Sequence, residues 1–359
     1  MELLTEIVVR KINHSRIREV DFENLEFGKY VSDHMLICDY NANGSYSSGW
    51  QQPYIVPFAN LSLNPSTLAL HYGQTVFEGM KAFRMHDGKI NIFRLERHYE
   101  RFAKSLDRMC MAVPPKDVFV EGLITLVQTD KEWIPRKAGQ ALYLRPFMYA
   151  SEARFGIKVS DEFRFMVFTG PVPELYASPI KVKVETEYIR AARGGTGFAK
   201  CGGNYGGAFL PTMEARKKGY DQVLWTTGQH NPTIEESGMM NIFFVIEDKL
   251  ITPPLSDTIL DGITRDSVLV LAKELGLQWE ERAISVDELE KAFQANTITE
   301  AFGAGTAAVV APIGTISINE IDYNLPGYSH ENVLNRIKQR LENIRLGLDE
   351  DIYGWNYVV

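Results

Sequence analysis

Strand-like and helix-like segments follow one another along this chain without the regular alternation that builds a doubly wound parallel sheet. Short runs rich in β-branched and aromatic residues predict strands at 89–93, 141–147, 163–169, 180–187, 222–226 and 241–246. Apolar residues at helical spacing predict helices at 94–109, 117–130, 264–275, from 285 onward and at 331–346. This irregular order favours the α+β class over a doubly wound sheet.

Sequence signals for helix ends accompany two of these helices. Thr264 can cap the start of the helix at 264–275, and Gly276 can end it because glycine readily adopts the left-handed conformation. Ser285 and Glu288 form the pattern of a capping box ahead of the next helix. These residues set the expected limits of both helices.

The length of the chain indicates more than one domain. Its 359 residues are too many for one ordinary small domain and suit two packed domains. The stretch at 170–179, which is rich in proline, is the best candidate for a linker. We therefore expect an N-terminal domain at 1–170, a linker at 171–180 and a C-terminal domain at 181–359.

Composition excludes several classes of protein. Hydrophobic residues make up 45% of the chain, which excludes a mostly disordered protein. The formal net charge of −8 makes nucleic acid a poor partner, because phosphate backbones attract basic proteins. The uncharged, apolar stretch at 301–318 contains three glycines and a proline, which are too many helix breakers for a membrane helix.

The cysteines and the first residues bear on the compartment. Cys38, Cys110 and Cys201 lie far apart with no CxxC pair, so we expect neither a disulfide framework nor an ordinary zinc site. Residues 1–6 lack the basic-then-apolar order of a signal peptide. We expect a soluble, cytoplasmic protein that uses no metal and binds neither nucleic acid nor a membrane.

The most unusual local composition lies at 194–207, where Lys200 is the only lysine among seven glycines in GGTGFAKCGGNYGG. Glycines let the backbone approach a flat ligand closely, and a lysine screened from water there could act as a nucleophilic amine. An aldehyde cofactor held as a Schiff base would suit such a lysine. A flexible surface loop with a solvated lysine is the alternative, whereas a P-loop is excluded because no Gly-Lys-Ser/Thr follows.

Three further segments are candidates for binding a phosphate or a pyridine ring. The segment at 261–266 leads into a predicted helix whose first N–H groups could bind phosphate, although an ordinary threonine cap is the simpler explanation. The glycines at 303–305 precede no helix, so a turn presenting N–H groups to an anion fits better than a dinucleotide site. Glu235 and Glu236 are either solvated acids or, for Glu236, the partner of a protonated pyridine nitrogen.

Taken together, these segments resemble the fold-type-IV pyridoxal-phosphate aminotransferases, and specifically the branched-chain amino-acid aminotransferases. The matching segments lie in the family's order and read DHMLICDY (33–40), HYGQTVFEGMKAFR (71–84), ALYLRPF (141–147), GGTGFAKCGGNYGG (194–207), EESGMMNIFF (235–244), PPLSDTILDGITRDS (253–267) and FGAGTAAVV (302–310). The resemblance implies an α+β protein of two domains. The cofactor is then expected between a smaller N-terminal α/β domain and a larger C-terminal domain with a mixed, barrel-like sheet.

The resemblance also implies roles for individual residues. Lys200 resembles the Schiff-base lysine, Tyr205 the partner of the cofactor's phenolic oxygen, and Glu236 the acid at the ring nitrogen. Residues that resemble the other cofactor contacts are Arg101, Arg190, Leu260, Gly262, Ile263, Thr264, Gly305 and Thr306. Residues that resemble the substrate site are Val31, Tyr72, Phe77, Tyr143, Arg145, Thr306 and Ala307.

Two positions depart from the pattern of the family. Ala308 and Ala311 stand where the animal enzymes carry a redox CxxC, so a thiol switch is excluded at that place. Val31 stands where an aromatic residue is expected, with Tyr30 beside it, which leaves the shape of the pocket mouth open.

The function implied by the resemblance is ping-pong transamination of leucine, isoleucine and valine with 2-oxoglutarate, using pyridoxal 5'-phosphate in a homodimer. Arg145 and nearby tyrosine hydroxyls would hold the γ-carboxylate of the second substrate. The alternatives are a D-amino-acid aminotransferase, an aminodeoxychorismate lyase, or a cofactor- or metabolite-sensing protein without activity. Intact Lys200, Tyr205 and Glu236 argue against the sensing protein.

Overall fold

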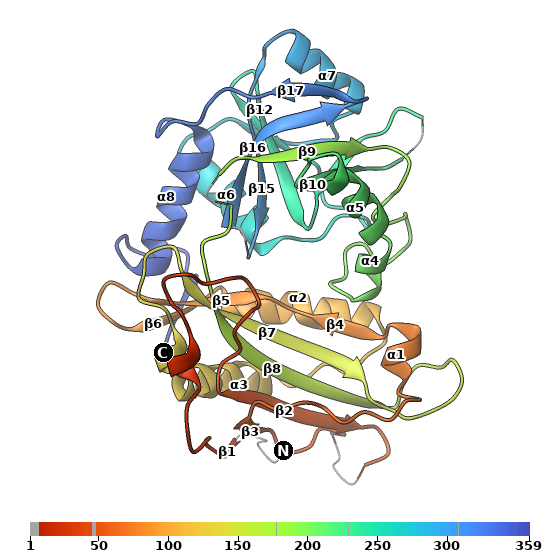
Figure 1. Cartoon of the computed structure of the whole chain (residues 1–359), viewed down its shortest axis with the longest axis vertical. Coiled ribbons are helices and arrows are strands. Elements are labelled where there is room, and N and C mark those ends of the chain that lie inside the picture. The colour runs from red at the N-terminus through yellow and green to blue at the C-terminus, as the bar shows by residue number, and fades with distance from the viewer. Residues whose placement is uncertain (1–6, 45–47, 177, 229, 308) are drawn as a thin grey trace. The chain divides into compact units, whose positions relative to one another are not determined.

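The computed structural model of the chain describes residues 7–44, 48–176, 178–228, 230–307 and 309–359 (Figure 1). The chain divides into two compact units. Unit 1 holds the chain up to Glu174 with Ala199–Gly203 and Ile344–Val359, and unit 2 holds Leu175–Phe198 and Asn204–Asn343. The two-part α+β architecture is confirmed, although unit 1 takes in more of the chain than unit 2 and is not the smaller part.

The expected domain limits of 1–170, 171–180 and 181–359 stay a prediction. Strand β8 (Glu162–Val172) runs into the expected linker, and the boundary between the units follows Glu174. The segment around Lys200 packs with unit 1, although the expectation had placed this lysine in the C-terminal domain. Ala177 of the expected linker lies outside the described residues.

Unit 1 is built on a mixed sheet with the strand order β1-β3-β2-β8-β7-β5-β6-β18, and β4 pairs with β7 (Figure 1). The strands are β1 (Val8–Val9), β2 (His34–Asn41), β3 (Tyr54–Pro57), β4 (Thr75–Phe77), β5 (Met80–Arg84), β6 (Ile90–Phe93), β7 (Ala141–Ala150), β8 (Glu162–Val172) and β18 (Asn356–Val358). Its helices are α1 (Leu68–Tyr72), α2 (Leu95–Arg108) and α3 (Lys116–Thr129), with short 3-10 turns η1 (Ile17–Glu19) and η2 (Lys131–Trp133).

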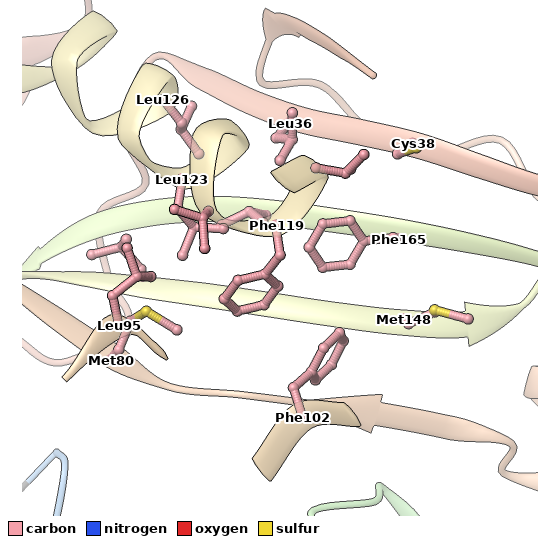
Figure 2. Packing of buried hydrophobic residues seen from close by; sticks show 14 of the residues in the cluster. Leu36, Cys38, Met80, Leu95, Phe102, Phe119, Leu123, Leu126, Met148 and Phe165 are labelled. Atoms are coloured by element: carbon pink, nitrogen blue, oxygen red, sulfur yellow. The ribbon is translucent and has the colours of Figure 1, made fainter. Parts of the chain in front are cut away.

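Helices α2 and α3 pack against one face of this sheet and form the main core of unit 1 (Figure 2). Phe102 of α2 and Phe119 of α3 contact Phe165 of β8 with ring centroids 5.7 and 5.8 Å apart. Leu123 and Leu126 of α3 extend the same apolar layer and are fully buried. The helical spacing of these side chains along each helix is therefore what buries them together.

Strand β7 separates two kinds of side chain. Leu142, Leu144 and Met148 belong to the core beneath α2 and α3. Because neighbouring side chains of a strand point to opposite faces, Tyr143 and Arg145 point away from that core. The alternation of apolar and polar residues in β7 thus delivers two predicted site residues to one face of the sheet.

Unit 2 contains a barrel. Its strands are β9 (Ile180–Glu185), β10 (Gln222–Thr226), β11 (Ile234–Ser237), β12 (Met240–Ile246), β13 (Lys249–Thr252), β14 (Trp279–Glu281), β15 (Ile298–Gly305), β16 (Val309–Ile318) and β17 (Ile321–Asn324). In the part of the chain that the structure describes, strands pair in the order β11-β10-β9-β16-β15-β12, and β12 pairs back to β11 to close the ring. The expected barrel-like mixed sheet is confirmed, since β9 runs parallel to β10 and β16 while the other pairs in the ring are antiparallel.

The helices of unit 2 are α5 (Phe209–Lys217), α6 (Ile263–Glu274) and α7 (Val286–Gln294), while α4 (Gly203–Gly206) and α8 (Val333–Leu346) contain residues of both units. The predicted helices and strands are all present, with β7 and β8 longer than expected and β9 ending at Glu185 instead of 187. These elements could be predicted from the spacing of apolar residues, because each buries one apolar face or lies wholly within a core.

The helix ends correct one prediction. Thr264 does not cap α6, because Gly262 occupies the N-cap position and Thr264 lies inside the first turn. Gly276 ends α6 as predicted, with a positive φ of 69° and the Leu277 N–H donating to the Ala272 carbonyl. Ser285 caps α7 by accepting the Glu288 N–H, but the Glu288 carboxylate pairs with Arg282 and does not complete the capping box.

Two further findings concern membrane-spanning helices and the cysteines. Among the described residues no helix is both long and apolar enough to cross a membrane. The three cysteines carry free thiols, and Cys38 and Cys201 are buried. Burial, together with the charge of Asp39, raises the pKa of the Cys38 thiol to about 12, so this thiol is unreactive at neutral pH.

Leu123→Ala should destabilise the protein by about 2–5 kcal/mol, because it leaves a cavity in the core of unit 1. Leu348→Ala is the matched control, since Leu348 is 58% exposed whereas Leu123 is fully buried. Its effect should stay within about 0.5 kcal/mol. Urea unfolding of both variants measures the difference, and equal losses would contradict the described core.

Candidate active site

Lys200 is fixed by backbone pairing within unit 1. The Phe77 N–H donates to the Lys200 carbonyl at 3.0 Å, and the Gly202 N–H donates to the Thr75 carbonyl at 3.1 Å. The Lys200 N–H donates to the Ser105 hydroxyl of α2 at 3.0 Å. The segment that carries the lysine is therefore held against β4 on one side and α2 on the other.

Glycine is required beside the lysine because the approach to β4 is close. A Cβ atom at Gly202 would lie 2.4 Å from the Thr75 hydroxyl, which is too short for any real contact. The glycine-rich composition that singled out Lys200 thus has a local cause at this position. It is not explained by a flexible surface loop, since the backbone on both sides of Lys200 is paired.

Two cationic side chains contact the Phe77 ring. The Lys200 Nζ and the Arg145 Cζ each lie 4.9 Å from the centroid of this ring. Contacts of this kind attract a cation to the face of an aromatic ring. The structure therefore brings together three residues that the sequence predicted for one site.

Arg145 differs from the other arginines of the site in its partners. Its Nη2 donates to the Tyr143 hydroxyl at 3.1 Å, and its buried Nε has no hydrogen-bond partner among the described residues. No ion pair within those residues includes Arg145, so it does not brace the fold by pairing with an acid. A partly buried guanidinium without a carboxylate partner is suited to bind an anionic ligand.

Tyr143 is packed against Gly79. A Cβ atom at Gly79 would lie 1.9 Å from the Tyr143 hydroxyl oxygen, so only glycine fits there. The Phe27 ring contacts the Tyr143 ring edge-on with centroids 5.3 Å apart. Burial raises the pKa of the Tyr143 hydroxyl, which keeps the hydroxyl neutral near pH 7.

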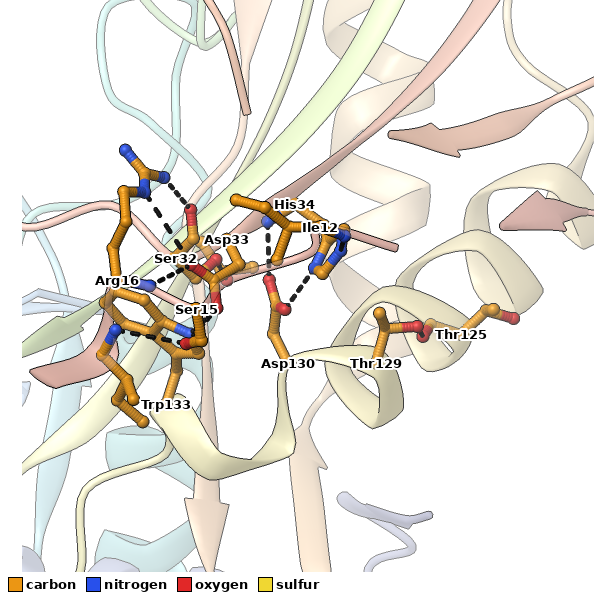
Figure 3. A network of polar contacts seen from close by, with 12 residues as sticks. Ile12, Ser15, Arg16, Ser32, Asp33, His34, Thr125, Thr129, Asp130 and Trp133 are labelled. Atoms are coloured by element: carbon orange, nitrogen blue, oxygen red, sulfur yellow. Dashed lines mark hydrogen bonds and ion pairs between the residues drawn. The ribbon is translucent and has the colours of Figure 1, made fainter. Parts of the chain in front are cut away.

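Val31 directly precedes Ser32, which belongs to the polar network in Figure 3 through its carbonyl and the Arg16 side chain. The next residue, Ser32, donates its N–H to the Thr169 carbonyl at 2.8 Å, which fixes Val31 next to Gly170. Gly170 is the register partner of Tyr143 across β7 and β8. The structure therefore places the backbone of Val31 close to the strand position opposite Tyr143, and its role at the pocket mouth stays a prediction.

The network in Figure 3 anchors the segment that follows Val31. Asp33 accepts from the Ser15 hydroxyl, the Arg16 N–H and the Trp133 indole N–H at 2.5 to 3.0 Å. The His34 Nδ1 lies 2.6 Å from Asp130, while its Nε2 accepts the Ile12 N–H at 2.9 Å. Both ring nitrogens of His34 are therefore engaged, which fixes the orientation of the ring.

Arg101 is paired with an acid. Its Nε and Nη2 donate to the two carboxylate oxygens of Glu78 at 2.7 and 2.8 Å. The expected contact of Arg101 with the cofactor phosphate stays a prediction. Tyr72 ends α1 with 43% of its surface exposed, and its role toward the substrate carboxylate likewise stays a prediction.

Glu236 is the best-defined acid of unit 2. Its Oε1 accepts the Leu260 N–H at 2.8 Å and the Asn241 side-chain amide at 3.3 Å. Its Oε2 lies 2.9 Å from the Arg190 Nε as an ion pair. A carboxylate held by such donors stays ionised, as required of a residue that keeps a pyridine nitrogen protonated.

Arg190 also ties two loops together. Its Nη2 donates to the carbonyls of Gly197 and Thr258. A Cβ at Gly197 would lie 2.7 Å from the Thr258 Cα, so the loops touch backbone to backbone. Arg190 therefore orients Glu236 and fixes the loop that leads toward the lysine segment along the chain.

The start of α6 has the features of an anion site. Gly262 is the N-cap and offers no side chain to the first turn, so the N–H groups of Ile263 and Thr264 have no side-chain cap bond. A Cβ at Gly262 would lie 1.9 Å from the Asn241 Oδ1, so only glycine fits at this N-cap. Asn241 therefore connects Glu236 with the start of α6.

The third predicted element, the glycine-rich turn, follows β15. Thr306 and Ala307 lie in the turn between β15 and β16, whose strands pair Gly305 with Val309. Asn241 of β12 pairs with Ala304 of β15 and with Glu236 of β11. The turn, the acid and Asn241 thus lie at neighbouring strand positions of the barrel. Ala308 lies outside the described residues.

Sequence reasoning missed three residues. Asn241, Glu78 and Ser105 hold predicted site residues in place but received no role from the sequence. Asn241 and Glu78 lie within segments that resemble the family, and this resemblance is the sequence signal that could have identified them. Tyr205 lies in α4, and its role at the cofactor's phenolic oxygen stays a prediction.

The residues described above fit pyridoxal phosphate. An amine on a fixed backbone, a buried carboxylate and an uncapped helix start match its aldehyde, its ring nitrogen and its phosphate. The glycine at the helix start leaves room that a Cβ would fill.

Comparisons with known proteins agree with this chemistry. The family model "Amino-transferase class IV" matches residues 75–316. A probable branched-chain-amino-acid aminotransferase of Staphylococcus aureus is 42% identical over 343 residues, which cover 93% of each chain. The branched-chain-amino-acid aminotransferase 2 of Bacillus subtilis is 40% identical over 338 residues, which cover 93% of this chain and 92% of the relative.

Solved structures show the same fold. A branched-chain aminotransferase from Thermoproteus uzoniensis, solved with norvaline, matches with a TM-score of 0.72 and 25% identity, covering 90% of this chain and 99% of that one. A branched-chain amino acid aminotransferase from Thermobaculum terrenum, solved in its PLP-form, matches with a TM-score of 0.72 and 24% identity, covering 91% of this chain and 98% of that one.

Ser105→Ala should loosen the lysine segment, because the Lys200 N–H loses its acceptor. We expect a loss of about 1 kcal/mol of stability and faster amide exchange in the peptide containing 200–202. Thr129→Ala is the control, since that hydroxyl only donates to a carbonyl of its own helix. Hydrogen exchange followed by mass spectrometry distinguishes the two, and unchanged exchange at 200–202 would contradict the anchoring role.

Proposed function

Since the chain belongs to the class IV aminotransferases and, within them, to the branched-chain amino-acid aminotransferases, we propose that it transfers the amino group of leucine, isoleucine and valine to 2-oxoglutarate. The observation that carries the proposal is the joint placement of Lys200 and Arg145 on the Phe77 ring. Lys200 is the proposed amine for the cofactor, and Arg145 has no acidic partner among the described residues. This pair suits substrates that carry a carboxylate.

We propose pyridoxal 5'-phosphate as the cofactor. When bound, it supplies an electron-withdrawing ring that stabilises the charge left when the α-proton is removed. Lys200 would hold its aldehyde carbon, Glu236 its ring nitrogen and Tyr205 its phenolic oxygen. The proposed phosphate and ring contacts are Arg101, Arg190, Leu260, Gly262, Ile263, Thr264, Gly305 and Thr306.

Lys200 and Glu236 have separate proposed roles in proton transfer. The Lys200 Nζ is the proposed general base and acid that moves the α-proton of the amino acid. Its backbone is paired on both sides, so the amine moves only through side-chain rotation about a fixed Cα atom. Glu236 keeps its charge through the Leu260 and Asn241 donors and the Arg190 ion pair, and so holds a proton on its partner nitrogen.

Dual specificity follows from the composition of the pocket wall. Phe77 and Val31 offer apolar surface to a branched side chain. Arg145 and the Tyr143 hydroxyl offer hydrogen-bond donors to a γ-carboxylate. Tyr72 and the Thr306–Ala307 backbone are the proposed partners of the α-carboxylate, which both substrates share.

We propose a homodimer, supported by an exposed apolar surface on unit 1. Phe155 and Ile157 are 99% and 82% exposed, and Leu70 of the adjoining α1 is 59% exposed. The segment that carries Phe155 and Ile157 is joined to the residues just before α1, because the Arg154 N–H donates to the Ser66 carbonyl. Apolar surface of this kind is usually covered by a partner, and a second copy of the chain is the proposed one. A cytoplasmic location and a role in amino-acid biosynthesis complete the proposal, with free thiols as the support for a reducing compartment.

The purified protein should convert leucine, isoleucine and valine with 2-oxoglutarate into glutamate and the matching 2-oxo acids. A panel that includes D-alanine and aminodeoxychorismate tests the two related activities in the same assay. Turnover of D-alanine without turnover of leucine would overturn the proposal. Binding of cofactor without turnover of any amino acid would favour a sensing protein.

Arg145→Met should weaken the half-reaction with 2-oxoglutarate by about ten- to a hundredfold, because a charge-assisted hydrogen bond is worth about 1.5–3 kcal/mol. The leucine half-reaction should change little, since an apolar side chain gains nothing from the charge. Arg145→Lys keeps the charge and should recover part of the loss. Single-turnover rates measure each half-reaction separately, and equal losses in both would contradict a selective role.

A further inference from the structure

Glu78 is a buried acid that the proposed chemistry does not use. It has no exposed surface, and its carboxylate is surrounded by hydrogen-bond donors. Arg101 donates to both of its oxygens, at 2.7 and 2.8 Å, and His98 lies 2.9 Å from Oε2 through its Nδ1. The Gly79 N–H donates to Oε2 at 3.1 Å. The cost of burying this carboxylate is therefore offset by one cation and two further donors.

The charges of this cluster are well defined. Burial alone would raise the pKa of Glu78, but the charge of Arg101 and the hydrogen bonds from Arg101 and His98 hold it well below its usual range. Burial lowers the pKa of His98, so this imidazole stays neutral and donates from Nδ1. Glu78 and Arg101 thus form a buried, bidentate ion pair with one neutral histidine.

The backbone of Glu78 is fixed by the same strand that carries Arg145. The Glu78 N–H donates to the Pro146 carbonyl at 2.7 Å. Its neighbours Phe77 and Gly79 contact Lys200 and Tyr143, as described above. The backbone of Glu78 therefore lies beside residues proposed to bind the substrate, while its side chain contacts residues of α2.

A bidentate carboxylate fixes the plane of a guanidinium group, whereas a long arginine side chain otherwise samples many rotamers. Helix α2 presents His98, Arg101 and Ser105 at positions three and four residues apart, which places them on one face. All three are buried and contact Glu78 or the Lys200 backbone. The face of α2 thus serves the predicted site rather than the apolar core.

We propose that Glu78 is a positioning residue that holds Arg101 in the orientation in which Arg101 binds the phosphate of the cofactor. This inference rests on the proposed function, in which Arg101 is a phosphate contact. Glu78 itself touches neither the cofactor nor the substrate in this account. Its removal should weaken recognition of the phosphate and leave recognition of the pyridine ring intact.

The test compares two probes, pyridoxal 5'-phosphate and pyridoxal, which differ only in the phosphate. The full-length protein is freed of cofactor with hydroxylamine, and the affinity for each probe is measured by absorbance titration. In the wild type the phosphate should strengthen binding by several orders of magnitude. Glu78→Gln should reduce this ratio of affinities about ten- to a hundredfold while the affinity for pyridoxal stays close to wild type.

Glu300→Gln is the matched control. Glu300 is also a buried carboxylate, but it accepts the N–H groups of Val333 and Leu334 in unit 2. A general loss of packing would lower the affinity of either variant for both probes and leave the ratio unchanged. Glu78→Asp keeps the charge but shortens the side chain, so it should lower the ratio less than Glu78→Gln and gives a second reading if the glutamine variant fails to fold.

The outcomes separate the inference from the function on which it rests. A wild-type protein that binds both probes equally would overturn the phosphate role of Arg101 itself. A wild type that prefers the phosphate, with the same preference in Glu78→Gln and Glu78→Asp, would overturn the positioning role alone. The double variant Glu78→Gln/Arg101→Met should lose no more of the preference than Arg101→Met, because Glu78 acts only through Arg101.

Discussion

The pairing of 200–202 with β4 is the interaction on which the candidate site depends. Two backbone hydrogen bonds, Phe77 to Lys200 and Gly202 to Thr75, join segments more than a hundred residues apart in the sequence. They fix Lys200 beside the Phe77 ring, which Arg145 also contacts. A Cβ atom at 202 would clash with the Thr75 hydroxyl, so the pairing favours glycine there, while the Lys200 side chain takes no part in these backbone hydrogen bonds.

The arginines of the candidate site differ in whether they pair with a buried acid. Arg101 and Arg190 each pair with a buried glutamate, Glu78 and Glu236, and so keep those acids ionised. Arg145 has no such partner among the described residues; its Nη2 donates to the Tyr143 hydroxyl, and its guanidinium lies over the Phe77 and Tyr143 rings. A buried ion pair costs desolvation whether or not it assists chemistry, so pairs that orient neighbouring site residues have a functional explanation that isolated pairs lack.

The sequence predicted what depends on local pattern. Helix α2 and strand β7 were readable from periodicity, and Lys200 stood out by composition. The start of α6 was misjudged because the choice of Gly262 over Thr264 as the cap depends on the close approach of Asn241, which local sequence does not encode. The roles of Glu78 and Ser105 were not predicted for the same reason, since both residues act through contacts that form only after folding. The packing of 199–203 with unit 1 is likewise a product of tertiary contacts rather than of chain order.

If Lys200 is the amine that binds the cofactor, reduction of the purified protein with borohydride will trap the cofactor on this residue. Borohydride makes the bond between a lysine amine and the cofactor aldehyde permanent, so peptide mapping then identifies the lysine. The account predicts the cofactor on the peptide containing Lys200. Lys81 is the natural comparison, since its side chain is buried in unit 1. Cofactor on Lys81, or on any lysine other than Lys200, would contradict the account.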